Sequence, residues 1–133
     1  MVGGVLDTHT ILWFLSGDLR LSIIAKDFIT NSRIAGNDLA ISSITLIEMV
    51  YLIEKGRVPA DRFTEIVRMV RQPTRGLVEI PVDIEIARTL SRIDVSQVAD
   101  MPDRIIAATA LYLQVPILSK DRKIQLSNLT TIW

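Results

Sequence analysis

Cysteine is absent from this chain of 133 residues, and histidine occurs once, at His9. Without cysteine the protein has no disulfide bond, no thiolate nucleophile and no zinc site built on sulfur ligands. A single histidine also excludes every mechanism that needs a pair of histidines. Any catalytic site must therefore be built from other side chains.

Long apolar runs are also missing, although the mean hydropathy is positive. The two longest runs are interrupted, the first by Glu48 and the second by Gln114 and Pro116. Neither reaches the roughly 18 consecutive apolar residues that a membrane span requires. The segment from Met1 to Asp7 contains no basic side chain and no long apolar stretch. We therefore expect no secretory signal and a cytoplasmic protein.

The chain has no excess of charge of either sign, with 15 basic and 15 acidic residues. A tight nucleic-acid binder usually shows an overall basic footprint, so any contact with RNA must be local. Hydrophobic residues make up 49% of the sequence, which is enough for a core without disulfides or a structural metal. We expect a single domain over residues 1–133.

Short apolar segments alternate with amphipathic segments along the chain. The apolar segments predict strands that end at Leu6 and that cover residues 39–42, 77–80, 115–118 and 129–132. The segments between them predict six helices and a short helical piece. The first helix is capped by Asp7, the second begins near Ser22, the third is capped by Ser43, the fourth spans about 60–72, the fifth is capped by Asp83, the sixth runs from Pro102 to near Gln114, and the short piece follows Asp121. Residues 31–38 are predicted as a loop. This order favours an α/β fold with parallel strands and helices on both faces of the sheet.

Acidic residues follow the predicted strands. Asp7 directly follows the first strand, Glu48 lies in the helix after the second, and Asp121 comes shortly after the fourth. Open parallel sheets bind ligands at the carboxyl ends of their strands, so we expect these three acids at one edge. Asp103 joins them if the helix that begins at Pro102 points its N-terminus toward the same edge.

Each acid also has a structural interpretation. Asp7 is equally suited to cap a helix. Asp103 could interact favourably with the dipole at the start of a helix, and Asp121 could occupy a solvated turn. Glu48 differs, because its neighbours on nearly every side are apolar. A helix that is apolar all round is expected to be buried, and a buried carboxylate is costly without a partner. The alternative is a glutamate at an exposed end of that helix.

Four carboxylates at one sheet edge would repel each other and raise one another's pKa values. No lysine or arginine lies close in sequence to Asp7 or Glu48, so a cation is the simplest remedy. Hard oxygen ligands suit Mg²⁺ or Mn²⁺. Such an ion activates a bound water and stabilises charge on a phosphodiester, which allows hydrolysis without a protein nucleophile.

Four segments of the sequence resemble the successive motifs of PIN domains, especially those of VapC-like toxins. The matching segments are Leu6-Asp7-Thr8-His9, the run 42–48 that ends at Glu48, Asp100-Met101-Pro102-Asp103-Arg104 with the apolar run after it, and Leu118-Ser119-Lys120-Asp121-Arg122. They span nearly the whole chain in matching order and spacing. The resemblance implies an α/β/α sandwich with a mainly parallel sheet of about five strands.

The resemblance also implies an activity and residue roles. It implies a Mg²⁺- or Mn²⁺-dependent endoribonuclease toxin that forms homodimers and is inhibited by a cognate antitoxin in the active-site groove. By motif position the metal-binding and catalytic acids are Asp7, Glu48, Asp103 and Asp121, with Asp100, Ser119 and Thr8 in supporting roles. Apart from the resemblance, three basic residues lie near these acids and are candidates for contacting the substrate phosphate: Arg104, Arg122 and Lys123. The chain departs from the family pattern at two positions. Ser119 stands where threonine is more common, and Lys123 stands where some members have another acidic residue.

Two alternatives use the same fold class. A Mg²⁺-dependent domain that transfers phosphoryl groups on aspartate would need a second aspartate two residues after Asp7, where His9 stands, or an aspartate at the end of the third strand, which instead ends at Ile80 and Pro81. The other is a PIN-fold binding module without catalysis. His9 and Trp13 lie beside Asp7 and are candidates to touch substrate, although packing or surface exposure is the preferred interpretation.

Overall fold

The computed structural model describes residues 1–121, 124 and 128–133, and the side chain of Arg75 is not described. The strands are β1 (Val2–Leu6), β2 (Asp38–Ser42), β3 (Leu77–Ile80), β4 (Ile117–Leu118) and β5 (Thr131–Ile132). The helices are α1 (Thr8–Ser16), α2 (Ile23–Ile34), α3 (Ser43–Glu54), α4 (Asp61–Arg71), the short 3₁₀ helix η1 (Pro73–Arg75), α5 (Ile84–Leu90) and α6 (Met101–Leu113). The helical piece predicted after Asp121 falls mostly outside the described residues.

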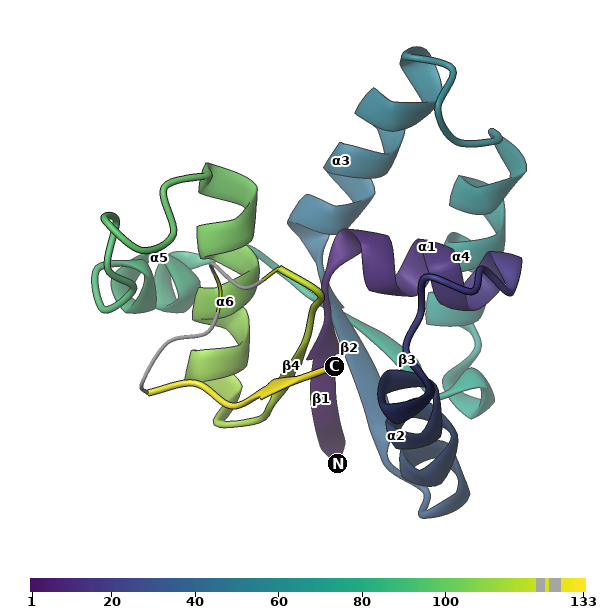
Figure 1. The fold of residues 1–133 in the computed structure, drawn as a ribbon, viewed down its shortest axis with the longest axis horizontal. Coiled ribbons are helices and arrows are strands. Elements are labelled where there is room, and N and C mark those ends of the chain that lie inside the picture. The colour runs from purple at the N-terminus through teal and green to yellow at the C-terminus, as the bar shows by residue number, and fades with distance from the viewer. Residues whose placement is uncertain (122–123, 125–127) are drawn as a thin grey trace.

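All five strands pair in parallel, in the order β3-β2-β1-β4-β5. The central strand β1 pairs with β2 on one side, where Val5 lies opposite Ala40, and with β4 on the other, where Val5 lies opposite Ile117. Helices cover both faces of this sheet (Figure 1). The predicted α/β/α sandwich with a parallel five-stranded sheet is therefore confirmed.

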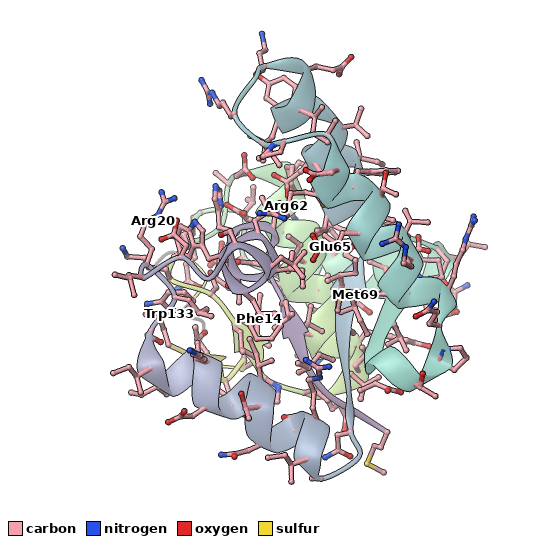
Figure 2. All side chains as sticks on the ribbon, turned by 90° about the vertical axis from the view of Figure 1, so that its right-hand side faces the viewer. Phe14, Arg20, Arg62, Glu65, Met69 and Trp133 are labelled. Atoms are coloured by element: carbon pink, nitrogen blue, oxygen red, sulfur yellow. The ribbon has the colours of Figure 1, made fainter. Side chains whose placement is uncertain are left out.

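Neighbouring residues of each strand enter different cores, because side chains alternate between the two faces of a sheet. Val5, Ala40 and Ile117 pack with α5 and α6, whereas Leu6 and Leu118 pack with α1, α2 and α4. The second core also contains partly buried side chains, including Phe14 and Met69, which are labelled in Figure 2. Apolar residues on both faces explain why the strand sequences read as continuous apolar runs.

Several predicted boundaries were wrong by a few residues. Helix α2 continues to Ile34, where a loop was predicted, because Ser32 follows Ile29 on the buried face, while Asn31 and Arg33 lie on the exposed face. Ser42, not Ser43, caps α3, because the hydroxyl of Ser43 instead donates to Glu79 and to the Ile80 carbonyl. The capping hydroxyl thus belongs to the last residue of β2.

The last two strands and the start of α6 also differ from the prediction. Strands β4 and β5 contain two residues each, shorter than the predicted 115–118 and 129–132. Helix α6 begins at Met101, one residue before Pro102, because Asp100 serves as its N-cap. The amide of Asp103 donates to Asp100 Oδ2 at 3.2 Å, which satisfies a free donor of the first turn.

Helix α3 is not buried on all sides, contrary to the expectation. Ile47, Val50 and Tyr51 are 63%, 44% and 56% exposed. The cause is the position of α3, which projects with α4 beyond the sheet, so that only part of its surface meets the core (Figure 1). No helix among the described residues is long and apolar enough to cross a membrane.

The crowding around Gly4 gives a test of the packing between β1 and its neighbours. A Cβ atom at Gly4 would lie 3.1 Å from Leu118 Cδ1 and 3.1 Å from Phe28 Cε1, whereas a Cβ at Gly3 would meet nothing closer than 3.4 Å. We expect Gly4→Ala to lower the free energy of unfolding by about 1–3 kcal/mol, the range for overpacking. Gly3→Ala is the matched control, and urea unfolding measures both. Equal stability of the two variants would contradict the described packing.

Candidate active site at the carboxyl edge of the sheet

Asp7 lies where β1 ends and α1 begins. Its Oδ1 accepts a hydrogen bond from the Thr10 amide at 2.8 Å, and its own amide donates to the Leu118 carbonyl at 3.2 Å. The side chain is only 8% exposed. The predicted helix cap and the predicted site position are therefore the same residue, because a cap at the end of a parallel strand lies at the carboxyl edge of the sheet.

Glu48 is tied to α1 through hydroxyl groups. Thr8 Oγ1 donates to Glu48 Oε1 at 2.5 Å and lies 3.1 Å from Thr45 Oγ1. Both threonines are buried, and Glu48 is half-buried. Burial raises the pKa of the Glu48 carboxyl, and the bond from Thr8 opposes that shift. Thr8 therefore holds Glu48 in place and stabilises its charged form.

Asp103 enters the site from the first turn of α6. Because α6 leads into the N-terminal end of β4, the helix begins at the opposite, carboxyl edge, and the condition placed on Asp103 is met. The pKa of Asp103 is raised to about 7, first by burial and then by repulsion from other acids, which are Asp100, Asp121, Glu48 and Asp7. The structure thus brings all the predicted acids, together with Asp100, into one electrostatic cluster.

The loop after β4 carries Ser119, Lys120 and Asp121. Ser119 is 1% exposed, and its Oγ accepts a hydrogen bond from the Asp121 amide at 3.0 Å. This bond folds the chain sharply after β4 and directs Asp121 back toward the other acids. Asp7 and Asp121 line one cleft, of about 260 Å³, together with Lys120 and two aromatic residues.

Of the three predicted phosphate-contacting residues, the structure describes only Arg104. Arg104 points its Nη2 at the carbonyls of Leu90 (3.3 Å) and Ile93 (3.4 Å), at and just beyond the end of α5, where carbonyl groups attract a cation. The structure therefore does not present Arg104 to the acidic cluster. Arg122 and Lys123 lie outside the described residues.

Sequence comparison with known families gives a match over nearly the whole chain. The model of the PIN domain matches residues 4–128. The chain belongs to the PIN domain family. The resemblance seen in its four motifs is thereby confirmed, and the cluster at the carboxyl edge is the part of this PIN domain that those motifs build.

This PIN domain is similar to a ribonuclease in sequence and to VapBC proteins in structure. It is 25% identical to ribonuclease VapC22 of Mycobacterium tuberculosis over 121 residues. The aligned region covers 91% of this chain and 88% of that protein. Among solved structures it resembles VapBC2 from Rickettsia felis, bound to a DNA fragment from their promoter (TM-score 0.70, 18% identity, covering 98% of this chain and 97% of the other). DNA-bound VapBC from Salmonella typhimurium is similar (TM-score 0.70, 20% identity, 98% and 97% coverage).

Two side chains of this PIN domain escaped the sequence analysis. Thr45 completes the hydroxyl link to Glu48, and its position three residues earlier on the same helix could have indicated it. Lys120 lines the cleft beside Asp7 and Asp121, but in the sequence it reads as an ordinary turn residue. The first could be found from helical spacing, and the second needed the folded loop.

Removal of the Asp103 charge should stabilise the fold. The folded pKa of about 7 exceeds the ordinary value of 3.8, so the folded state binds more protons between these values and loses stability as the pH rises through that window. Without divalent cations, Asp103→Asn should be more stable than wild type at pH 8. Because the side chain is half exposed, solvent screening limits the gain to about 1–2 kcal/mol.

Unfolding in urea with EDTA, at intervals from pH 4 to pH 8, measures this difference. The gain should shrink steadily as the pH falls toward 4, because Asp103 then becomes protonated in the folded state and its charge no longer opposes folding. Asp27→Asn, which changes an exposed acid of α2, is the control and should show no such trend. A constant difference between Asp103→Asn and wild type across this range would contradict the clustering.

Proposed function

We propose that this chain, as one PIN-like domain over residues 1–133, is a Mg²⁺- or Mn²⁺-dependent endoribonuclease and the toxin of a toxin–antitoxin pair. The observation that carries the proposal is the convergence of acids around Asp103, which raises its pKa to about 7. Support comes from the ribonuclease name of the mycobacterial relative and from the VapBC assemblies with the same fold. A phosphoryl-transfer domain is disfavoured by membership of the PIN family.

The acids fit a hydrated divalent ion better than a cage of protein ligands. Among residues 1–121, 124 and 128–133, no three His, Asp or Glu side chains converge at the distances of direct ligands. Mg²⁺ usually keeps several waters and takes only one or two carboxylates directly. Asp7, Glu48, Asp103 and Asp121 would hold the ion, in part through waters. The bound ion would lower the pKa of a water and stabilise charge on the phosphodiester.

The surrounding residues position these acids. The Thr10 amide fixes Asp7, the Thr8 hydroxyl fixes Glu48, and the Ser119 hydroxyl fixes the backbone at Asp121. Asp100 adds negative charge near Asp103 and caps α6. Asp7 and Glu48 are therefore oriented, and the backbone at Asp121 is fixed, before an ion or a substrate arrives, so less free energy is needed to arrange the site.

The exposed surfaces suit the partners that a toxin needs. A groove of about 380 Å³ lies between α1 and the α3–α4 pair, lined by apolar residues such as Leu12, Leu52 and Val58 and by Arg20, Arg57 and Arg62. Figure 2 shows Arg62 with its ion-pair partner Glu65 on α4. We assign this groove to a segment of the antitoxin and the exposed apolar face of α3 to a homodimer. A toxin that cuts cellular RNA would act in the cytoplasm.

Purified protein should cut RNA only with Mg²⁺ or Mn²⁺ present. EDTA should abolish cleavage of a mixed RNA pool, and Asp7→Asn should reduce it at least 100-fold, because the variant weakens the charge that holds the ion. In cells, overexpression should arrest growth, and Asp7→Asn should relieve the arrest. Asp27→Asn is the control and should match wild type in both assays. Cleavage that survives EDTA, or a toxic Asp7→Asn variant, would refute the proposal.

Loss of the Thr8 hydroxyl should weaken metal binding more than it weakens the fold. Thr8→Val removes the donor to Glu48, and we expect the Mg²⁺ concentration for half-maximal cleavage to rise about 10- to 100-fold. Thr8→Ser keeps the donor and should restore most of the affinity. Thr109→Val, which removes a buried hydroxyl bonded to the Ile105 carbonyl within α6, is the control. An equal effect of Thr8→Val and Thr109→Val would show that Thr8 only contributes to packing.

A further inference from the structure

An aromatic cluster lies next to the acids and has no role in holding a metal. The rings of His9 and Trp13, one turn apart on α1, have centroids 5.6 Å apart, and Trp133 meets Trp13 edge-on at 5.8 Å. His9 is exposed and Trp13 is half-buried. Two cations flank the Trp13 ring, with Arg20 at 4.9 Å and Lys120 at 5.8 Å from its centroid.

The cleft beside these rings is continuous with the acidic cluster. It is lined by Asp7 and Asp121 together with His9, Trp13 and Lys120. His9 and Trp13 also line the larger groove between α1 and the α3–α4 pair. The two rings therefore stand between the acids, where a phosphodiester would be hydrolysed, and a longer groove that leads away from them.

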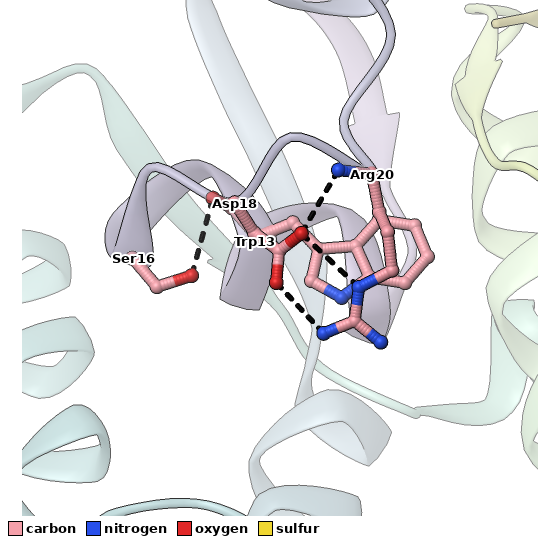
Figure 3. Close-up of polar contacts among 4 residues, drawn as sticks. All are labelled: Trp13, Ser16, Asp18 and Arg20. Carbon is pink, nitrogen blue, oxygen red and sulfur yellow. Dashed lines mark hydrogen bonds and ion pairs between the residues drawn. The ribbon is translucent and has the colours of Figure 1, made fainter.

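The turn that follows α1 contacts Trp13 at its backbone and at its ring. Asp18 donates its amide to the Trp13 carbonyl at 3.0 Å, and its carboxylate accepts bonds from Arg20 Nε at 3.1 Å and Nη2 at 2.7 Å. Figure 3 shows the Arg20 guanidinium held by Asp18 against the Trp13 ring. A ring that is already fixed loses little conformational entropy when a ligand stacks on it.

Lys120 is placed differently from Arg20. It is exposed, and among the salt bridges of the described residues none involves it. A planar ligand can replace the Lys120 ammonium at the ring, while the ammonium remains close enough to pair with an anion next to Asp121. Arg20 stays in position because Asp18 binds it through both carboxylate oxygens.

This combination of groups matches one kind of ligand. Flat rings beside a cation are suited to single-stranded nucleic acid, in which each base has a face that stacks and each linkage carries a negative charge. Among the residues that the structure describes, the lining of the cleft includes no Val, Leu or Ile, unlike the neighbouring groove with Leu12, Leu52 and Val58. It therefore suits a nucleotide better than the apolar side chain of a protein partner.

We propose that His9, Trp13 and Lys120 form a nucleotide subsite, in which a base of single-stranded RNA stacks on the ring pair and Lys120 contacts the phosphate beside Asp7 and Asp121. This inference rests on the proposed ribonuclease function and extends it to the substrate class. It assigns to Trp13 the positioning of the nucleotide next to the bond that is cut.

Binding in EDTA separates this subsite from catalysis. A fluorescein-labelled RNA hexanucleotide and the same strand with abasic residues are titrated by anisotropy against wild type, Trp13→Leu, Trp13→Phe and Lys120→Gln. Tyr112→Leu and Lys26→Gln remove an exposed ring and an exposed charge that do not line the cleft, and serve as matched controls. In a Trp133→Phe background Trp13 is the only tryptophan, so quenching of its fluorescence locates the bound strand.

Trp13→Leu should weaken binding of the normal strand about tenfold or more, the usual effect of losing one stacked base, while leaving the abasic strand nearly unaffected. Trp13→Phe should restore part of this loss. Lys120→Gln should weaken both strands equally and reduce the slope of the salt dependence by about one. Both control variants should bind within twofold of wild type, and RNA should quench Trp13 fluorescence.

Three results would overturn the subsite: binding of the normal strand by Trp13→Leu within twofold of wild type, an equal loss for the abasic strand, or quenching of Trp13 by a polyglutamate peptide and not by RNA. The last result would assign the cleft to a protein partner. If Trp13-dependent binding is found but Mg²⁺ and Mn²⁺ produce no cleavage, the ribonuclease proposal fails and the subsite stands. If RNA is cut but Trp13→Leu binds it normally, the subsite alone fails.

Discussion

The parallel pairing of β1 with both β2 and β4 is the constraint on which the rest of the structure depends. Parallel strands end at the same edge, so the residues that follow them must meet there, whatever their separation in sequence. Asp7 follows β1 directly, and the Asp7 amide donates to the Leu118 carbonyl at the end of β4. Asp7 and the loop that contains Asp121 are thus joined by the hydrogen-bonding pattern of the sheet itself.

That edge gathers negative charge at a cost to the fold. Burial and repulsion raise the pKa values of Glu48 and Asp103. Hydrogen bonds made by these acids or by neighbouring residues offset part of the free energy that the fold loses in this way. Asp7 and Asp100 cap helices, and Thr8 donates to Glu48. Each of these bonds satisfies a polar group that the fold would otherwise leave free, so the same contacts serve both stability and the arrangement of the site.

The cleft next to the acids and the groove beyond Trp13 are lined by different kinds of side chain. The cleft next to Asp7 and Asp121 is aromatic and cationic, whereas the groove beyond Trp13 adds aliphatic walls and further arginines. The chain as a whole has no net charge, but Arg20 and Lys120 both lie against the Trp13 ring beside this cleft. Local arrangement, and not total charge, is what distinguishes this region.

The sequence alone determined the fold class and most of the acidic cluster. Apolar strands alternating with amphipathic helices leave few arrangements other than a parallel sheet covered on both faces, and acids that directly follow strands must lie at its carboxyl edge. Asp7 and Asp121 were predictable for that reason, and Asp103 was predictable once the direction of α6 was known.

Only the tertiary structure decided how the side chains around these acids are used. The bond from Thr8 to Glu48 depends on how α1 packs against α3, and the turn of Arg104 toward α5 depends on carbonyl groups that only the folded chain brings within its reach. The exposed apolar face of α3 was missed because periodicity reports which residues are apolar, not how far a helix extends beyond its sheet. Sequence periodicity reflects local geometry, whereas these features arise from contacts between segments that are distant along the chain.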